Sequence, residues 1–168
     1  MHPPASGPVR TLAVWCADWP TVALRRPPAE PVVVLHANRV LAASPGARSH
    51  GITPGLRLRE AQARCPSVGT HERDDQRDAR AFEVVVSALE QFAPRIEVVE
   101  PGRCAVPTLG PSRYHGGDRA LAGKVLERVR AELAVHLGDG RVPCAVGVAV
   151  ADGPRAARPP RRPLRVPP

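Results

Sequence analysis

The stretch Arg95-Ile-Glu-Val-Val-Glu-Pro-Gly-Arg-Cys-Ala-Val-Pro-Thr108 predicts a β-hairpin, because two short runs rich in β-branched residues flank a Pro101-Gly102 turn. An amphipathic helix is predicted on each side of it. The helix before the hairpin begins at Asp74-Asp75 and ends before Pro94, and the helix after it covers 118–137. Apolar residues recur in both at the three- and four-residue spacing of a helix face.

Two apolar strands, at 11–16 and 144–150, complete the pattern. The predicted order is strand, an insert of about fifty residues, helix, strand, strand, helix, strand. Without the insert this is the βαββαβ motif of ferredoxin-like folds, which belong to the α+β class. In such a fold the first strand lies beside the middle hairpin. Cys16 is therefore expected near the Gly102-Arg103 turn.

The insert has a hairpin signal of its own, Val32-Val-Val-Leu35 and Val40-Leu-Ala-Ala43, and two short helical segments at 45–50 and 57–64. It is predicted to form a small subdomain. The predicted segments are a disordered lead at 1–9, the first part of the main domain at 10–24, the insert at 25–75, the second part of the main domain at 76–152, and an Arg/Pro-rich disordered tail at 153–168.

Composition indicates a soluble cytoplasmic protein without a membrane partner, because no run of eighteen apolar residues and no signal peptide is present. The formal charge of +8 suggests a polyanionic partner, but residues 154–168 hold five arginines and the remainder carries only +3. We expect this tail to supply phosphate or DNA contacts through Arg155, Arg158, Arg161 and Arg162. No cofactor is expected.

Three local features have plain structural interpretations. The cysteines at 16, 65, 104 and 144 lie in apolar settings without paired spacing, which indicates buried free thiols and no metal site. Asp18 before Trp19-Pro20 is interpreted as a helix cap. The charged run over 71–78 is interpreted as a solvated link into the following helix.

Four motifs in order resemble the Y-family DNA polymerases of the UmuC/DinB type, over about residues 10–152. The N-terminal motif is Cys16-Ala-Asp-Trp-Pro-Thr21, and Glu100-Pro-Gly-Arg-Cys104 occupies the place of the second acid motif. Between them stand Ala42-Ala-Ser-Pro-Gly-Ala-Arg-Ser-His-Gly-Ile-Thr-Pro-Gly-Leu56 and Glu60-Ala-Gln-Ala-Arg-Cys-Pro66. The resemblance implies a ferredoxin-like βαββαβ palm with an inserted small fingers subdomain.

The departures from this resemblance bear on activity. The positions of the metal-binding acids correspond to Cys16, Gly102 and Arg103, and a two-metal site needs hard oxygen ligands. Arg48 remains from the fingers motif, as a phosphate or DNA contact or equally as a solvated helix arginine. This pattern, and the phrase Leu12-Ala-Val-Trp-Cys-Ala-Asp-Trp-Pro20, is similar to the degenerate ImuB branch. It implies no catalytic residue, no metal and no enzyme activity.

The resemblance therefore implies a non-catalytic adaptor in translesion synthesis and damage-induced mutagenesis. The alternatives are an active Y-family polymerase that transfers nucleotides to a primer end, or a ferredoxin-like module with no role on DNA. The partners implied for a full-length relative are DNA, a sliding clamp, an error-prone replicative-type polymerase and a RecA-like cassette partner. The tail stands where the family continues into a thumb, so we expect a truncated fragment that binds DNA weakly.

Overall fold

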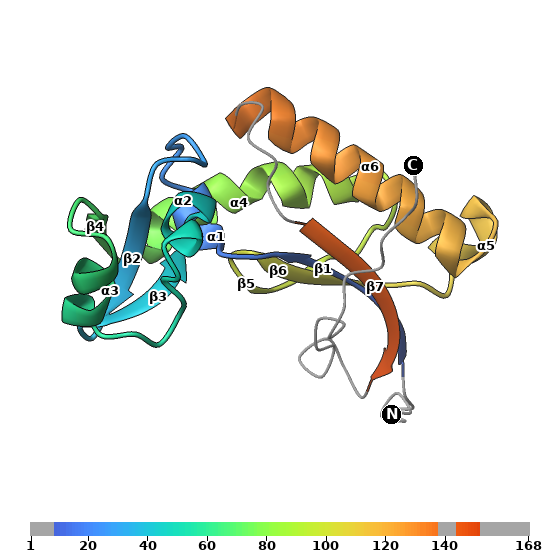
Figure 1. Ribbon diagram of the computed structural model, residues 1–168. Coiled ribbons are helices and arrows are strands. Elements are labelled where there is room, and N and C mark those ends of the chain that lie inside the picture. Colours follow the sequence, from blue (N-terminus) through green and yellow to red (C-terminus); the bar gives the residue numbers. More distant parts are fainter. Residues whose placement is uncertain (1–8, 138–143, 152–168) are drawn as a thin grey trace.

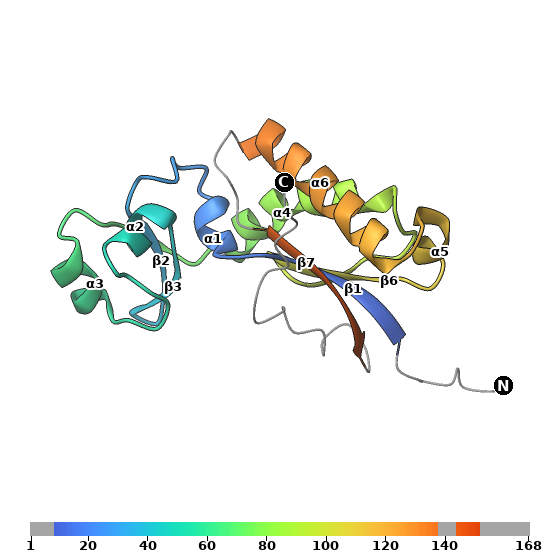
Figure 2. The same cartoon turned by 45° about the vertical axis from the view of Figure 1, so that its right-hand side comes forward.

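The computed structural model describes residues 9–137 and 144–151, which form two lobes, each built on a β-sheet (Figure 1). The large lobe holds a four-stranded sheet and the two long helices. The small lobe holds a three-stranded sheet and two short helices. In both views the lobes lie side by side, with a short helix where they meet (Figure 2).

The sheet of the large lobe has the order β5-β6-β1-β7, and each neighbouring pair is antiparallel. Its strands are β1 (Val9–Cys16), β5 (Glu97–Glu100), β6 (Arg103–Pro107) and β7 (Cys144–Ala151). Helices α4 (Asp75–Glu90) and α6 (Asp118–Leu137) contact each other and cover one face of this sheet (Figure 1). This is the expected ferredoxin-like arrangement, and the α+β prediction is confirmed.

The core of the large lobe lies between its sheet and the two helices. Its buried side chains are aliphatic groups and thiols apart from Trp19 and Phe82, whose rings meet edge to face with centroids 5.1 Å apart. At the start of α4 the side chain of Asp74 accepts a hydrogen bond from the backbone N–H of Arg77 at 2.9 Å, so the predicted cap is confirmed. Buried leucines and valines from α4, α6, β1 and β6 fill the remaining space.

The small lobe matches the predicted insert hairpin and adds a strand that the sequence did not suggest. β2 (Val32–His36) and β3 (Arg39–Ala43) are joined by a two-residue turn in which Ala37 and Asn38 both have positive φ. β4 (Gly69–Glu72) pairs parallel with β2. Helices α2 (Pro45–Ser49) and α3 (Leu58–Arg64) pack beside this sheet.

The charged run over 71–78 is not simply a solvated link, and that interpretation was wrong in part. His71 and Glu72 lie in β4, and Asp78 is buried in the first turns of α4. The Asp78 carboxylate accepts two hydrogen bonds from the guanidinium of Arg77, at 2.8 and 3.0 Å. Burial raises the pKa of Asp78, against the opposing effect of Arg77.

Two short helices complete the described chain. α1 (Trp19–Val22) follows β1 at the junction of the lobes, and α5 (Pro111–His115) precedes α6. Trp19 anchors α1, because its ring is buried and its indole N–H donates to the carbonyl oxygen of Asp78 at 2.9 Å. Among the residues the structure describes, no helix is long and apolar enough to span a membrane.

Candidate functional site

The end of β1 and the β5–β6 turn meet at one place, as the sequence predicted. Trp15 is paired with Arg103 in the sheet, and the backbone N–H of Cys16 donates to the carbonyl oxygen of Gly102 at 2.8 Å. Gly102 has a φ of 95°. A Cβ added there would lie 2.6 Å from the Cβ of Trp19, so the backbone passes too close to α1 for any side chain.

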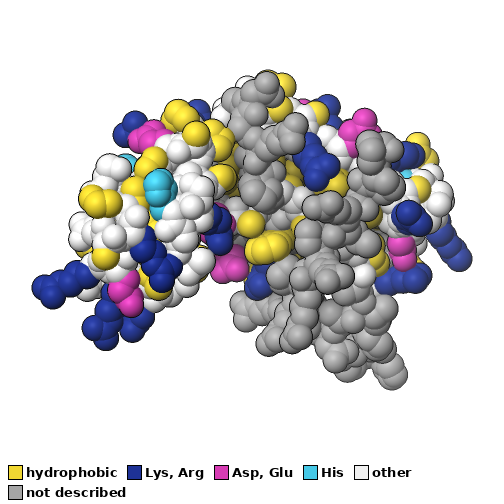
Figure 3. Space-filling view, viewed as in Figure 1, with side chains coloured by type: hydrophobic (Ala, Val, Ile, Leu, Met, Phe, Trp, Pro, Cys, Tyr) yellow, Lys and Arg dark blue, Asp and Glu magenta, His cyan; other side chains and the backbone are white. Residues whose placement is uncertain are grey.

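A cleft of about 370 Å³ opens at this place. Its lining comes from residues 15–20, the β5–β6 turn, β3 and α2 of the small lobe, and residues 73–78. In the space-filling view, basic and acidic side chains stand close together where the two lobes meet (Figure 3). We take this cleft as the candidate site, because it unites three of the sequence-predicted site positions, Cys16, Gly102 and Arg103.

Asp18 and Arg48 connect the two lobes across the cleft. One carboxylate oxygen of Asp18 accepts from Nε and Nη2 of Arg48 at 2.9 and 2.6 Å, and the other accepts from the backbone N–H of Ala43 at 3.2 Å. Asp18 stands at the N-cap position of α1, as predicted, but its side chain makes no capping hydrogen bond and its backbone has a positive φ. Arg48 is thus paired with Asp18 and partly exposed, and its role as a phosphate or DNA contact stays a prediction.

Arg103 has unused hydrogen-bonding capacity at the floor of the cleft. Its Nε is buried and has no hydrogen-bond partner. The nearest carboxylate oxygen, of Glu100, is 3.7 Å from that nitrogen, beyond hydrogen-bond distance. The Arg103 side chain is 25% exposed, so part of its guanidinium reaches the cleft while Nε is shielded from solvent.

Three thiols lie beneath the cleft in the core of the large lobe. Cys16 and Cys144 are opposite each other on β1 and β7 with their sulfur atoms 2.8 Å apart, and Cys104 lies on the neighbouring strand β6. The contact with Cys144 raises the pKa of Cys16, and burial raises it further. Burial also raises the pKa of Cys104 to about 12. All four cysteines are buried and free, as predicted.

The residues of the cleft do not fit a pair of divalent metal ions. Within the described residues, no three His, Cys, Asp or Glu side chains are arranged to hold a metal. Three carboxylates are bound by arginines instead: Asp18 by Arg48, Asp75 by Arg73 and Asp78 by Arg77. Glu100 is mostly exposed, and its nearest described ionic partner is Arg103. A divalent cation needs several unpaired anionic oxygens, which this arrangement does not provide.

The sequence-predicted phosphate contacts divide into two groups. Arg48 lies in the cleft, whereas Arg155, Arg158, Arg161 and Arg162 lie outside the described residues. Arg73 and Asp75, which also line the cleft, were not predicted. They follow the unpredicted strand β4, so no sequence signal placed them against the β5–β6 turn.

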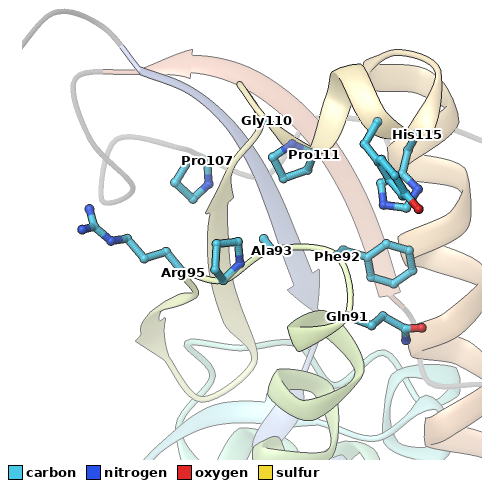
Figure 4. Close-up of a pocket in the computed structure, with 10 residues that line it drawn as sticks. Gln91, Phe92, Ala93, Arg95, Pro107, Gly110, Pro111 and His115 are labelled. Carbon is cyan, nitrogen blue, oxygen red and sulfur yellow. The ribbon is translucent and has the colours of Figure 1, made fainter.

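A second hollow, of about 550 Å³, lies at the opposite end of the large lobe, beside α5. Prolines and rings dominate it: Phe92 and His115 have ring centroids 5.4 Å apart, while the side chain of Arg95 extends away from them (Figure 4). None of its residues was a predicted site residue. Neither the end of β1 nor the β5–β6 turn, which meet at the cleft, lines this hollow.

The chain matches the family model described as the impB/mucB/samB family over residues 20–151. Two relatives are named "DNA polymerase IV 2". The one from Mesorhizobium japonicum is 29% identical over 101 residues, which cover 60% of this chain and 24% of the relative. The one from Halalkalibacterium halodurans is 29% identical over 107 residues, which cover 61% of this chain and 26% of the relative. The chain thus spans about a quarter of the length of these relatives.

Solved structures show the same fold. "Dbh Ternary Complex (substrates partially disordered)" has a TM-score of 0.64 at 18% identity and covers 83% of this chain and 41% of its own. "Crystal Structure of DinB from Sulfolobus solfataricus" has a TM-score of 0.62 at 17% identity, and the match covers 83% of this chain and 42% of the solved one. At these identities the likeness concerns the fold alone.

These findings correct one expectation. No enzyme activity was expected from the sequence, because the resemblance predicts acids at 16, 102 and 103 where other residues stand. Both curated relatives, however, are named as DNA polymerases, which are enzymes, and this overturns that expectation.

Proposed function

The chain belongs to the impB/mucB/samB family, and from this premise we propose that the protein containing it acts as a Y-family DNA polymerase of translesion synthesis. In this proposal the large lobe is the palm and the small lobe the fingers. The reaction is transfer of a nucleotide to the primer end of a DNA template. Its place of action would be the cytoplasm, as the sequence analysis expected.

The observation that carries the proposal is the position of the cleft. It lies where the end of β1 and the β5–β6 turn meet, facing the fingers, and three arginines from both lobes line it: Arg48, Arg73 and Arg103. Guanidinium groups pair with phosphate oxygens in bidentate geometry. Arg48 and Arg73 are paired with Asp18 and Asp75, so in this proposal Arg103 holds a phosphate of a nucleotide or of DNA and the other two add positive charge around it.

The residues of this chain contribute positioning and charge. The sheet pairing of Trp15 with Arg103 fixes the floor of the cleft, and the link between Asp18 and Arg48 fixes the fingers against it. In polymerases that use two metal ions, the ions stabilise the charge that develops on the transferred phosphoryl group. Because the described carboxylates do not fit such a pair, we assign no step to metal ions here.

Primer extension tests the proposal. A labelled primer–template would be incubated with nucleotides and magnesium, using this chain and a full-length relative that carries the same residues at 16, 102 and 103. Template-dependent product from the full-length protein is expected. If neither protein makes product while both remain folded and the full-length protein binds the DNA, the proposal is wrong.

A second candidate role is assembly, and it is compatible with the first. Its support is that the cleft carboxylates are engaged by arginines and that residues 12–20 are similar to the ImuB branch. In this role the full-length protein would bring DNA, a sliding clamp, an error-prone polymerase and a RecA-like partner together during damage-induced mutagenesis. Complementation of a deletion strain tests it. If a full-length variant that no longer binds the clamp still restores damage-induced mutagenesis to the deletion strain, the assembly role is contradicted.

A further inference from the structure

We propose that the cleft holds a phosphate group directly on Arg103, without a bridging divalent cation. The inference rests on the proposed function for the origin of that phosphate, which is a nucleotide or a DNA backbone. The chemistry that recognises it, a guanidinium group meeting phosphate oxygens, is the same for both.

The first support is the unused donor of Arg103. A guanidinium group stays charged in proteins and has five N–H donors, and a buried donor without a partner is costly to the fold. Here the Nε is buried without a partner in the structure. The Arg103 side chain is still 25% exposed and lines the cleft, so a phosphate oxygen, the acceptor that best matches a guanidinium, can meet its exposed part.

The second support is how firmly Arg103 is placed. It is the first residue of β6, it is paired with Trp15 of β1, and the turn before it is fixed by the hydrogen bond between Cys16 and Gly102. The backbone that presents this guanidinium therefore belongs to the core sheet. Less order has to be gained on binding than for an arginine on a loop.

The third support is the state of the other charges in the cleft. Arg48 is already paired with Asp18, and Arg73 with Asp75, each at 2.6 Å. These two arginines therefore contribute mainly to the electrostatic potential around a phosphate and do not bind it directly. Glu100 is the one cleft carboxylate that competes for Arg103, and it stands 3.7 Å away and is 64% exposed. Such a contact is weak and easily exchanged for a stronger anion.

A divalent cation in the same place is disfavoured for the same reason. The fixed positive charge of Arg103 would repel it, and no described cluster of metal ligands is available. Phosphate binding in this cleft is therefore expected to persist in the presence of a chelator. The cleft volume of about 370 Å³ lies in the range of small-ligand sites.

Both tryptophans of the chain, Trp15 and Trp19, line the cleft, so their fluorescence reports binding there. Inorganic tripolyphosphate is the first probe, because it absorbs no light and contains no base. It would be titrated into the 168-residue chain with EDTA and, separately, with magnesium. We expect saturable binding in EDTA, no more than threefold weaker than in magnesium. Binding that requires magnesium overturns the proposal.

Variants test the residue assignment, with circular dichroism confirming that each is folded. Arg103→Ala should weaken binding at least tenfold, and Arg103→Lys should weaken it less, because a lysine keeps the charge but not the planar fork. Glu100→Gln should bind severalfold more tightly, because it removes the competing carboxylate. Arg113→Ala, the same change on exposed α5 away from the cleft, should have no effect. Equal affinity of Arg103→Ala and the unaltered chain overturns the proposal, as does binding that is lost only when the chain ends at Gly153.

Two further arms separate the sources of the phosphate. A deoxynucleoside triphosphate competes with tripolyphosphate if the ligand is a nucleotide, and a DNA duplex without a free triphosphate competes if it is the backbone. Competition by neither overturns the inference. A negative primer-extension result would refute the polymerase proposal and leave the tripolyphosphate result standing, so the two failures are distinguishable.

Discussion

Replacing Gly102 by alanine should destabilise the large lobe by two separable effects. The first is conformational, because Gly102 has a φ of 95°, a region in which a side chain is strained. The second is steric, because the new Cβ would lie 2.6 Å from the Cβ of Trp19 and 3.2 Å from the carbonyl oxygen of Cys16. Neither neighbour can move freely, since Trp19 is locked against Phe82 and Cys16 is in the sheet.

Both effects have known magnitudes. The positive φ costs about 1–2 kcal/mol for a residue with a Cβ. Overpacking against a fixed core group costs about 1–3 kcal/mol more. The total of roughly 2–5 kcal/mol is a large share of the ~5–15 kcal/mol by which a domain is stable.

The matched control is Gly117→Ala. Gly117 also lies in the large lobe with a φ of 105°, but a Cβ there meets nothing within 4 Å. It should therefore show the conformational cost alone. Urea unfolding followed by far-ultraviolet circular dichroism measures both variants, since the tryptophan signal itself would change when Trp19 is displaced. If the two variants lose the same stability, the packing of Trp19 over Gly102 is not as described and the reasoning fails.

Three further predictions concern the thiols and the carboxylates. A thiol reagent at neutral pH should react slowly with the native chain and rapidly with four thiols after unfolding, because all four are buried; rapid native labelling would contradict this. Burial raises the pKa of Asp78, so its contribution to the free energy of unfolding should fall as the pH rises above the ordinary pKa of an aspartate. Asp78→Asn should remove that contribution when urea unfolding is compared between about pH 4 and 7. A stability difference between the two proteins that is constant with pH would refute it. Asp18→Asn should lower the free energy of unfolding by about 1 kcal/mol, because the ion pair with Arg48 is partly exposed. If the two side chains act as a unit, adding Arg48→Ala should lower it little further. Fully additive losses in the double-mutant cycle would disprove the link.

The elements of the large lobe were predictable because each carries its own periodic signal. The three- and four-residue apolar spacing of the two long helices and the apolar strands predicted at 11–16 and 103–108 need no information from elsewhere in the chain. Their βαββαβ order then fixes which strands are neighbours. That is why the meeting of Cys16 with Gly102 and Arg103 could be foreseen.

Strand β4 and the burial of Asp78 were not predictable in this way. Gly69–Glu72 contains one β-branched residue among glycine, histidine and glutamate, and only its pairing with β2 makes it a strand. Asp78 stands in a charged run, and its burial depends on Arg77 and on the approach of Trp19 from α1. Contacts between distant segments decide both, so local sequence patterns do not contain them.

Packing couples Cys16, Gly102 and Arg103, the three positions at which the resemblance to Y-family polymerases predicts acids, and it decides how an acid could be introduced there. Gly102 has no room for a Cβ while Trp19 holds α1, and Cys16 lies in the core against Cys144. The contact with Cys144, and then burial, raise the pKa of the Cys16 thiol, and an aspartate in the same buried place would tend to stay protonated. An acid at 103 alone would remove the guanidinium whose buried Nε has no hydrogen-bond partner. Restoring the acids one at a time therefore tests packing and not metal chemistry, and a meaningful restoration has to change Trp19 and Cys144 together with them.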